Sequence, residues 1–197
     1  NLRFTSMRRT CVGGSAMPMA LIAKFMDNYG VEVRHGWGMT ETTAVATMSN
    51  LSRADRLKPA AEQHAIVAKQ GKTVSGIEIK IVDENGAALP HDGKSAGDLL
   101  VKGPWVIGAY FKQEGSNPLV DGWFPTGDVA TIDADGFMQI TDRSKDVIKS
   151  GGEWISSIDV ENIAMAHPAV AMAACIGMRH PKWDERPIVC VVKKPGA

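Results

Sequence analysis

The amino-acid sequence predicts an α/β segment, then a mainly antiparallel β unit, and then a small α+β unit. Three observations predict this order. An apolar pattern of helical period at residues 17–29 leads into a strand pattern, alternating apolar positions and turn residues recur between residues 77 and 140, and a helix pattern with two apolar strands begins after residue 156. The expected units are residues 1–70, 71–141 and 142–197.

An amphipathic helix and a strand make up the first predicted unit. Four apolar side chains share one face of the helix, namely Leu21, Ile22, Phe25 and Met26. Pro18 suits a first helical turn, and Gly30 suits a C-terminal stop. Residues 31–35 then have the pattern of a short strand, and the glycines on both sides of Trp37 predict a turn at residues 36–38.

Hairpins make up the second predicted unit. Ile77, Ile79 and Ile81 alternate with polar residues before a turn sequence at residues 83–86. Two further apolar stretches, at residues 129–132 and 137–140, lie on either side of a turn sequence at residues 133–136. Alternation of this kind, interrupted by turns rich in Asp and Gly, is typical of antiparallel strands.

A dense charge cluster at residues 142–146 separates two apolar segments and predicts a domain boundary. Beyond it we expect a glycine turn at residues 151–152, a helix at 157–166 and two strands, near 170–176 and 188–192. Asp159 and Glu161 in the first turn favour the helix start, because acidic groups stabilise a helix N-terminus. No closing element follows the last strand, so we expect an incomplete third unit.

Composition excludes several function classes. The 22 basic and 22 acidic residues cancel, so no bulk field attracts nucleic acid or an anionic membrane surface. Cys11, Cys175 and Cys190 are too few and too widely spaced for a disulfide framework or a zinc site, which favours a reducing cytoplasm. No apolar run is long enough for a transmembrane segment. Residues 1–4 lack an initiator Met and a signal sequence, so we expect the chain to begin inside a longer protein.

The segment at residues 36–43 combines an aromatic ring, a hydroxyl and a carboxylate between glycines. Trp37 offers a face for a purine, the Thr40 hydroxyl suits a phosphate or acyl oxygen, and Glu41 suits the Mg²⁺ that accompanies a nucleotide. The same segment also fits a strand-to-helix turn with a core Trp and a surface Glu. Both interpretations stay open on this segment alone.

Two further segments have the same double interpretation. In the first, residues 11–18, the paired glycines Gly13 and Gly14 would allow the backbone to approach a flat ligand. They would equally suit an ordinary strand-to-helix turn. Residues 122–128 end in Asp128, which suits the two hydroxyls of a ribose but also closes a type II turn. Arg143 suits the same ribose or a phosphate, or an ion pair between domains.

Together, the order and spacing of these segments resemble the adenylate-forming superfamily of acyl-CoA synthetases, luciferases and peptide-synthetase adenylation domains. Trp37 stands where this superfamily usually has Tyr, and Asp98 stands where its Gly-Glu-Leu motif has Glu. The matching segments are residues 13–15, 37–41, 97–110, 126–128 and 142–161. Residues 149–159 resemble most closely the medium- and long-chain fatty acyl-CoA ligases and their relatives that activate methylthiopropionate, although Trp154 also fits a packing residue of a hairpin.

The resemblance implies a partial adenylate-forming fold, with an antiparallel β-barrel-like subdomain and the start of a mobile C-terminal domain. It implies formation of an acyl-adenylate from a carboxylic acid and ATP, then thioester formation with CoA, with Mg²⁺ as cofactor. It assigns catalysis to Thr40, Glu41 and Lys149; metal binding to Glu41; nucleotide binding to Gly13, Gly14, Ser15, Trp37, Gly38, Met39, Asp128 and Arg143; the hinge to Lys145; and CoA binding to Gly151 and Gly152. Lys149 also fits a solvated surface lysine.

Two parts of the superfamily pattern are not found in this sequence. The phosphate-binding loop is expected before Asn1 and the C-terminal catalytic lysine after Ala197, so we expect the isolated 197 residues to be inactive. Two other functions stay open: a non-catalytic nucleotide-binding module of this fold, and an adenylation domain that loads a carrier protein. The expected partners are a small carboxylic acid, ATP and CoA, with a homodimer left open.

Overall fold

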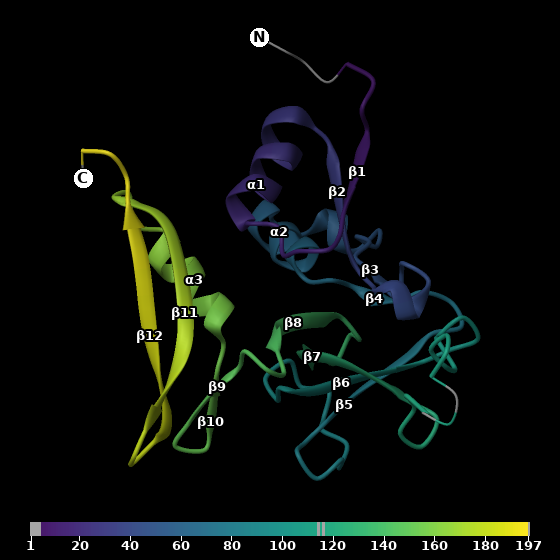
Figure 1. Cartoon of the computed structure of the whole chain (residues 1–197). Helices are drawn as coiled ribbons and strands as arrows, with labels where there is room; N and C mark the ends of the chain where they lie inside the picture. Colours follow the sequence, from purple (N-terminus) through teal and green to yellow (C-terminus); the bar gives the residue numbers. More distant parts are fainter. Residues whose placement is uncertain (1–4, 114, 116, 197) are drawn as a thin grey trace.

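The computed structural model describes residues 5–113, 115 and 117–196. The expectation that the chain begins inside a longer protein was drawn from residues 1–4, which lie outside the described residues. The described strands form three four-stranded sheets, and each sheet is built from a consecutive stretch of the chain. Figure 1 shows the first sheet stacked above the second, with the third beside them. The division into units at residues 70 and 141 stays a prediction.

The first sheet has a parallel pair extended by two short antiparallel strands. β1 (Arg9–Val12) pairs with β2 (Glu32–Trp37), and β3 (Thr47–Met48) and β4 (Lys72–Thr73) follow. The helices of this layer are α1 (Met19–Ala23), its π-helical continuation η1 (Lys24–Asn28), α2 (Ala60–Ala68) and the short η2 (Thr40–Thr42) and η3 (Asp55–Leu57). Ile22, Val33 and Val67 join α1, β2 and α2 in one buried cluster.

The predicted helix is confirmed over residues 19–28, with differences at its edges. Pro18 lies just before the first turn, and Gly30 follows the last turn with a positive φ of 63°. Ile22 is buried, but Leu21 is 41% exposed and does not share the buried face. Neither β1 nor α2 is predicted from the sequence, because β1 is four residues long and α2 is rich in alanine and lacks a strong apolar stripe.

The predicted turn at residues 36–38 is wrong. β2 continues through this segment, where Gly36 pairs with Met48 and Trp37 pairs with Thr47. The chain leaves the strand only after Trp37. A Cβ at Gly38 would lie 2.1 Å from the carbonyl oxygen of Ala44, so this position requires glycine because of close packing.

The second sheet is an antiparallel meander of β5 (Glu78–Val82), β6 (Gly97–Lys102), β7 (Phe124–Ile132) and β8 (Met138–Arg143). Its buried cluster includes Ile81, Leu99 and Met138. The predicted hairpins are confirmed, since the turns at residues 83–86 and 133–136 are each closed by a backbone hydrogen bond. The described strands form an open sheet, so the expected resemblance to a barrel is corrected to an open meander.

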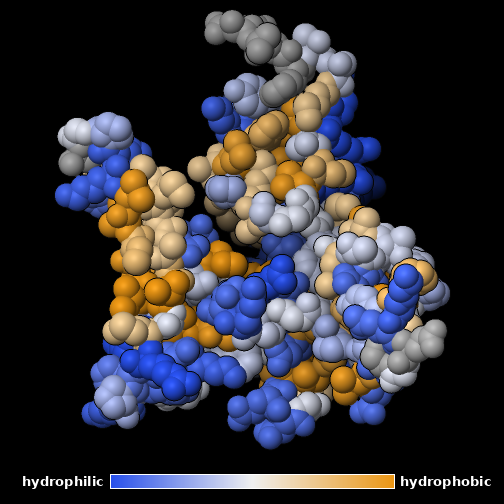
Figure 2. All heavy atoms as spheres, in the orientation of Figure 1, coloured by the Kyte–Doolittle hydropathy of each residue, from blue (hydrophilic) through white to orange (hydrophobic). Residues whose placement is uncertain are grey.

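The third sheet has the strand order β10-β9-β12-β11. Its elements are β9 (Ile148–Ser150), β10 (Glu153–Ile155), α3 (Ser157–Met165), β11 (Val170–His180) and β12 (Asp184–Lys193). The predicted glycine turn, helix and two strands are therefore confirmed. α3 covers one face of the β11–β12 hairpin, where Cys175 is buried. Figure 2 shows apolar surface over this hairpin, where Met172, Ile176, Met178 and Val192 are exposed.

None of the helices within the described residues has the length and apolar character needed to cross a membrane.

Candidate functional site

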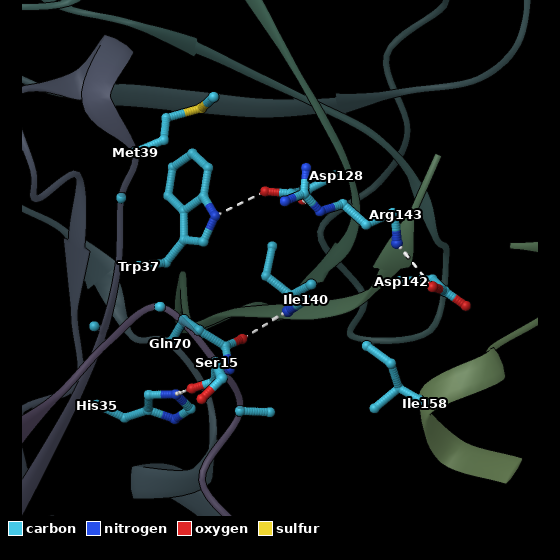
Figure 3. A pocket seen from close by; sticks show the side chains of 14 residues that line it. Ser15, His35, Trp37, Met39, Gln70, Asp128, Ile140, Asp142, Arg143 and Ile158 are labelled. Carbon is cyan, nitrogen blue, oxygen red and sulfur yellow. Dashed lines mark hydrogen bonds and ion pairs between the residues drawn. The ribbon is translucent and has the colours of Figure 1, made fainter. Parts of the chain in front are cut away.

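A cavity of about 230 Å³ lies where the three layers meet (Figure 3). Its walls come from the loop after β1, the end of β2, the segment after α2, strands β7 and β8, and the first turn of α3. The lining residues are Gly14, Ser15, Ala16, His35, Gly36, Trp37, Gly38, Met39, Gln70, Asp128, Ile140, Asp142, Arg143 and Ile158. Seven residues of the predicted nucleotide site line this one cavity.

Asp128 is the central polar group of the cavity. Its Oδ2 accepts a hydrogen bond from Trp37 Nε1 at 2.8 Å, and its Oδ1 pairs with Arg143 Nε at 3.3 Å. Asp128 and Arg143 are direct partners in the β7–β8 ladder, so the strand register itself places the two side chains together. Thr126 Oγ1 accepts the Asp128 backbone N–H and thereby fixes this part of β7.

The electrostatics of Asp128 reflect competition between burial and its two donors. Burial raises the pKa of Asp128, and the Trp37 indole N–H and the Arg143 guanidinium oppose that rise. Arg143 is mostly solvent-exposed, which weakens its contribution. Each carboxylate oxygen still has a lone pair to offer, so Asp128 can accept further hydrogen bonds from a ligand that enters the cavity.

His35 joins the glycine-rich loop to the end of α2. The ring is only 1% exposed, and its Nδ1 and Nε2 lie 3.0 Å from the Ala68 carbonyl oxygen and 3.2 Å from that of Ser15. The sequence interpretation missed His35 as a site residue. The sequence feature that could have indicated it is its position two residues after Val33. Side chains two residues apart in a strand lie on the same face, so His35 shares the buried face of β2 with Val33.

Gln70 is a second missed residue. Its Oε1 accepts the backbone N–H of Ile140 at 2.7 Å, and the residue is 5% exposed. This bond ties the segment after α2 to the middle of β8, across the floor of the cavity (Figure 3). No local pattern in the sequence indicates this role, because the partner lies 70 residues away.

The predicted adenine-contacting segment lies at the cavity wall. Gly14 and Ser15 line the main cavity, and Gly14 has a positive φ of 82°. Gly13 lines a neighbouring hollow instead, with Cys11 and Met48 among its other wall residues. The two hollows are separated by the end of β2.

Thr40 and Glu41 do not line the main cavity. They directly follow Met39, which does, and they form the short helix η2. Glu41 Oε1 accepts a hydrogen bond from the Tyr110 hydroxyl at 3.0 Å, and this bond raises the pKa of Tyr110. The structure thus places Trp37, Asp128 and the Gly14 segment together, with the predicted catalytic pair just beyond the edge.

Lys149, Gly151 and Gly152 line a different cleft, of about 840 Å³, between the third sheet and the β5–β6 connection. Lys149 Nζ lies 5.0 Å from the centre of the Trp154 ring. Gly151 lies against Trp183, and a Cβ there would be 2.8 Å from the Trp183 ring. Gly152 faces open space. In this conformation the three predicted residues are therefore not part of the main cavity.

The predicted hinge residue Lys145 is exposed in the connection between β8 and β9. Three hydrogen bonds join the end of β8, before it, to the start of α3, after it. Ser156 Oγ donates to the Thr141 carbonyl oxygen at 2.6 Å, and the Ser157 backbone N–H and hydroxyl donate to Asp142 at 2.6 and 3.2 Å. These bonds hold α3 against the end of β8.

The described residues contain no group of three or more His, Cys, Asp or Glu side chains placed to hold a metal ion. A magnesium ion that arrives with a nucleotide needs fewer protein ligands, because it commonly uses one or two carboxylates together with phosphate oxygens and water. Glu41 fits that requirement, since it is partly exposed and only one of its oxygens has a described protein partner.

Comparisons with known proteins give one consistent result. Residues 2–111 match the family described as AMP-binding enzyme, and residues 159–197 match the AMP-binding enzyme C-terminal domain. The chain is 52% identical to a 3-methylmercaptopropionyl-CoA ligase of Ruegeria lacuscaerulensis, over 98% of this chain and 36% of that protein. It is 51% identical to a medium-chain-fatty-acid–CoA ligase of Ectopseudomonas oleovorans, over 98% of this chain and 35% of that protein.

A similar solved structure is the o-succinylbenzoate CoA synthetase of Bacillus subtilis in complex with its acyl-adenylate intermediate. Its TM-score is 0.81 at 32% identity, over 98% of this chain and 38% of that one. The chain thus spans about a third of the length of the relatives that it matches.

Proposed function

The chain belongs to the AMP-binding enzyme family, and we propose that it forms the nucleotide-binding part of an ATP-dependent acyl-CoA ligase. The observation that carries this proposal is the arrangement of Asp128, which is buried at the meeting point of the layers and held between Trp37 and Arg143. A carboxylate has only acceptors, and two neighbouring hydroxyls of a ribose are donors that match it. The names of the similar proteins support the same assignment.

We propose an aliphatic carboxylic acid and CoA as the other substrates. Two relatives at about 50% identity are named for methylmercaptopropionyl and medium-chain fatty acyl groups, which are both unbranched and apolar. In the first step a carboxylate oxygen would attack the α-phosphorus of ATP, and the bond to pyrophosphate would break. In the second step the thiol sulfur of CoA would attack the acyl carbonyl carbon, and AMP would leave.

The residues of the cavity would act by fixing the nucleotide. Asp128 would accept hydrogen bonds from the ribose, Trp37 would lie against adenine, and the Gly14 segment would form the opposite wall. His35 would keep that wall in place through its contact with Ser15. Such fixed binding lowers the entropic part of the barrier, because the reacting groups are already aligned.

Thr40 and Glu41 would face the phosphates from the edge of the cavity. Thr40 is exposed and would orient the α-phosphate or the acyl carboxylate. Glu41 would hold Mg²⁺, which when bound neutralises charge as two anions approach. Tyr110 would keep the Glu41 carboxylate in position through their hydrogen bond.

The change from the first step to the second would use rotation about Lys145. Gly151, Gly152 and Lys149 lie outside the main cavity, so the proposed roles of the two glycines in binding CoA and of Lys149 in catalysis require this movement. Gly152 has open space around its Cα and carries no side chain, which would leave room for the pantetheine arm. We place the reaction in the cytoplasm, since Cys11, Cys175 and Cys190 are all unpaired.

The test is turnover by the full-length protein with a panel of aliphatic acids of different chain length, including a thioether acid. We expect pyrophosphate release and acyl-CoA formation, and a rise of at least tenfold in the KM for ATP in Asp128→Ala. We expect no turnover by residues 1–197 alone.

Three outcomes would contradict this proposal. Nucleotide binding without pyrophosphate release would indicate a non-catalytic module. Thioester formation on a carrier protein but not on free CoA would indicate a different acceptor. An unchanged KM for ATP in Asp128→Ala would remove the role of that residue.

A further inference from the structure

Trp37 has an orientation that stacking on a base does not require. Its ring is partly buried against the apolar clusters of the second sheet, and its N–H points at Asp128 rather than at solvent (Figure 3). The two residues are 91 positions apart in the sequence and lie on different sheets. A distance of 2.8 Å between Nε1 and Oδ2 is that of a strong hydrogen bond to a carboxylate.

The surroundings of Asp128 leave Trp37 as its buried donor. Arg143 on β8 forms an ion pair with Asp128, but 60% of its side chain is exposed. Asp142, also on β8, is turned toward α3 and binds Ser157 there. His35, on the same strand as Trp37, has both ring nitrogens at backbone carbonyl oxygens.

An indole fits this position better than a phenol would. The indole N–H is only a donor, so it always presents a hydrogen to the carboxylate. It also lies on the edge of the ring system, so the bond to Asp128 does not occupy a face of the ring that a base could contact. The adenylate-forming superfamily usually has a tyrosine at this position. The hydroxyl of a tyrosine lies at the tip of the ring and not on its side.

We propose that Trp37 is a positioning residue for Asp128: its indole N–H fixes Oδ2 and leaves the remaining lone pairs of the carboxylate directed at the ribose hydroxyls. This inference rests on the proposed nucleotide site and adds a role for Trp37 that acts through another residue. In this arrangement Trp37 links recognition of the base to recognition of the ribose, because its ring would lie against adenine and its N–H binds the Asp128 carboxylate, which would accept the ribose hydroxyls.

The role has a consequence for pH dependence. Burial raises the pKa of Asp128, and the Trp37 N–H opposes that rise. When this donor is removed, the carboxylate takes up its proton at a higher pH. Nucleotide affinity that depends on the ionised carboxylate is then lost earlier as the pH falls.

The experiment measures binding of AMP and of 2′,3′-dideoxy-AMP to the full-length protein between pH 5 and 8 by calorimetry. The variants are Trp37→Phe and a replacement of Trp37 by benzothienylalanine, which keeps the bicyclic shape but has sulfur in place of N–H. Asp128→Asn, alone and combined with each of the two Trp37 variants, completes a double-mutant cycle. The second variant preserves the packing if Trp37→Phe does not fold.

We expect the benzothienylalanine variant to bind AMP about tenfold more weakly at neutral pH, because a hydrogen bond to a charged group is lost. Its binding of the dideoxy compound should be unchanged, and its affinity for AMP should fall at a higher pH than that of the unmodified protein. An equal loss for both ligands, or additivity with Asp128→Asn, would overturn the inference. Failure of the unmodified protein to bind AMP at all would instead contradict the proposed function.

Discussion

At the scale of single residues, Asp128 shows a conflict between stability and binding. Burial raises its pKa, so the folded protein holds this proton more tightly than the unfolded chain does. The ionised form therefore lowers the free energy of unfolding at every pH above the folded pKa. That penalty disappears as the pH falls through the folded pKa and the carboxyl is protonated.

Asp128→Asn should separate these two effects. The amide keeps an acceptor for Trp37 but carries no charge, so we expect a higher melting temperature at pH 7.5 and a smaller gain near pH 4. AMP affinity should fall by about tenfold or more, because the acceptor-only group is lost. Thermal unfolding and calorimetric titration of the same preparations check both.

The exposed turn residue Asp135 supplies the control, since Asp135→Asn should change neither quantity. A lower melting temperature for Asp128→Asn at pH 7.5 would show that its hydrogen bonds outweigh the burial of its charge.

Residue types alone indicated some members of the cavity and not others. Trp37, Asp128 and Arg143 stand in motifs with recognisable spacing, and they lie together in the structure. Their functional roles stay predictions. His35 and Gln70 could not be predicted, because their partners are backbone groups on segments that only the fold brings close.

At the scale of the elements, the failed turn prediction has a clear physical cause. Gly36 does not break β2. It allows β3 to approach, because a Cβ there would lie 3.0 Å from the Thr47 carbonyl oxygen and 3.2 Å from the Met48 methyl carbon. A glycine inside a strand often indicates such a close approach. The hairpins and α3 could be predicted, since period and turn chemistry act locally.

Ser156 has two roles at the start of α3. Its hydroxyl accepts the Asp159 backbone N–H as an N-cap and donates to the Thr141 carbonyl oxygen, on the other side of the predicted hinge. Ser156→Ala should therefore weaken the helix start by about 1 kcal/mol. It should also loosen the contact between α3 and β8.

Limited proteolysis with trypsin measures this effect through cleavage after the exposed Lys145. We expect about fivefold faster cleavage in Ser156→Ala, if the site is cut in a transiently opened state. Ser157→Ala should have a smaller effect, because its backbone N–H still binds Asp142. Ser95→Ala, in an exposed turn of the β5–β6 connection, is the control and should not change the rate. Equal rates in all variants would argue against a restraint at this hinge.

At the scale of the whole molecule, the cavity exists because separate layers are fixed to one another. The segment after α2 supplies much of this attachment: the Gly71 carbonyl oxygen accepts the Met138 N–H, and Gln70 binds Ile140. Composition and local pattern do not predict such contacts, since they join residues about 70 positions apart. The order of the units could be predicted, but their assembly around one site required the structure.

The ion pair of Lys69 and Asp133 belongs to the same attachment. Lys69 Nζ lies 2.6 Å from Asp133 Oδ2, and Oδ1 accepts backbone N–H groups of the β7–β8 turn. Burial alone would raise the pKa of Asp133, but Lys69 and these N–H groups outweigh it and lower the pKa. An acid with a lowered folded pKa adds stability above its unfolded pKa, and this stability is lost as the pH falls through the folded value.

Asp133→Asn should therefore lower the free energy of unfolding by about 1 kcal/mol at pH 7, since the pair is partly exposed. The difference from the unmodified protein should shrink below about pH 4, the ordinary range of an aspartate, as the ionised carboxylate is lost there. Urea unfolding at a series of pH values measures this. A cycle with Lys69→Met isolates the pair from the turn hydrogen bonds, which the amide oxygen keeps. A difference that stays constant from pH 7 to pH 3 would mean that Asp133 stabilises the turn and not the attachment between layers.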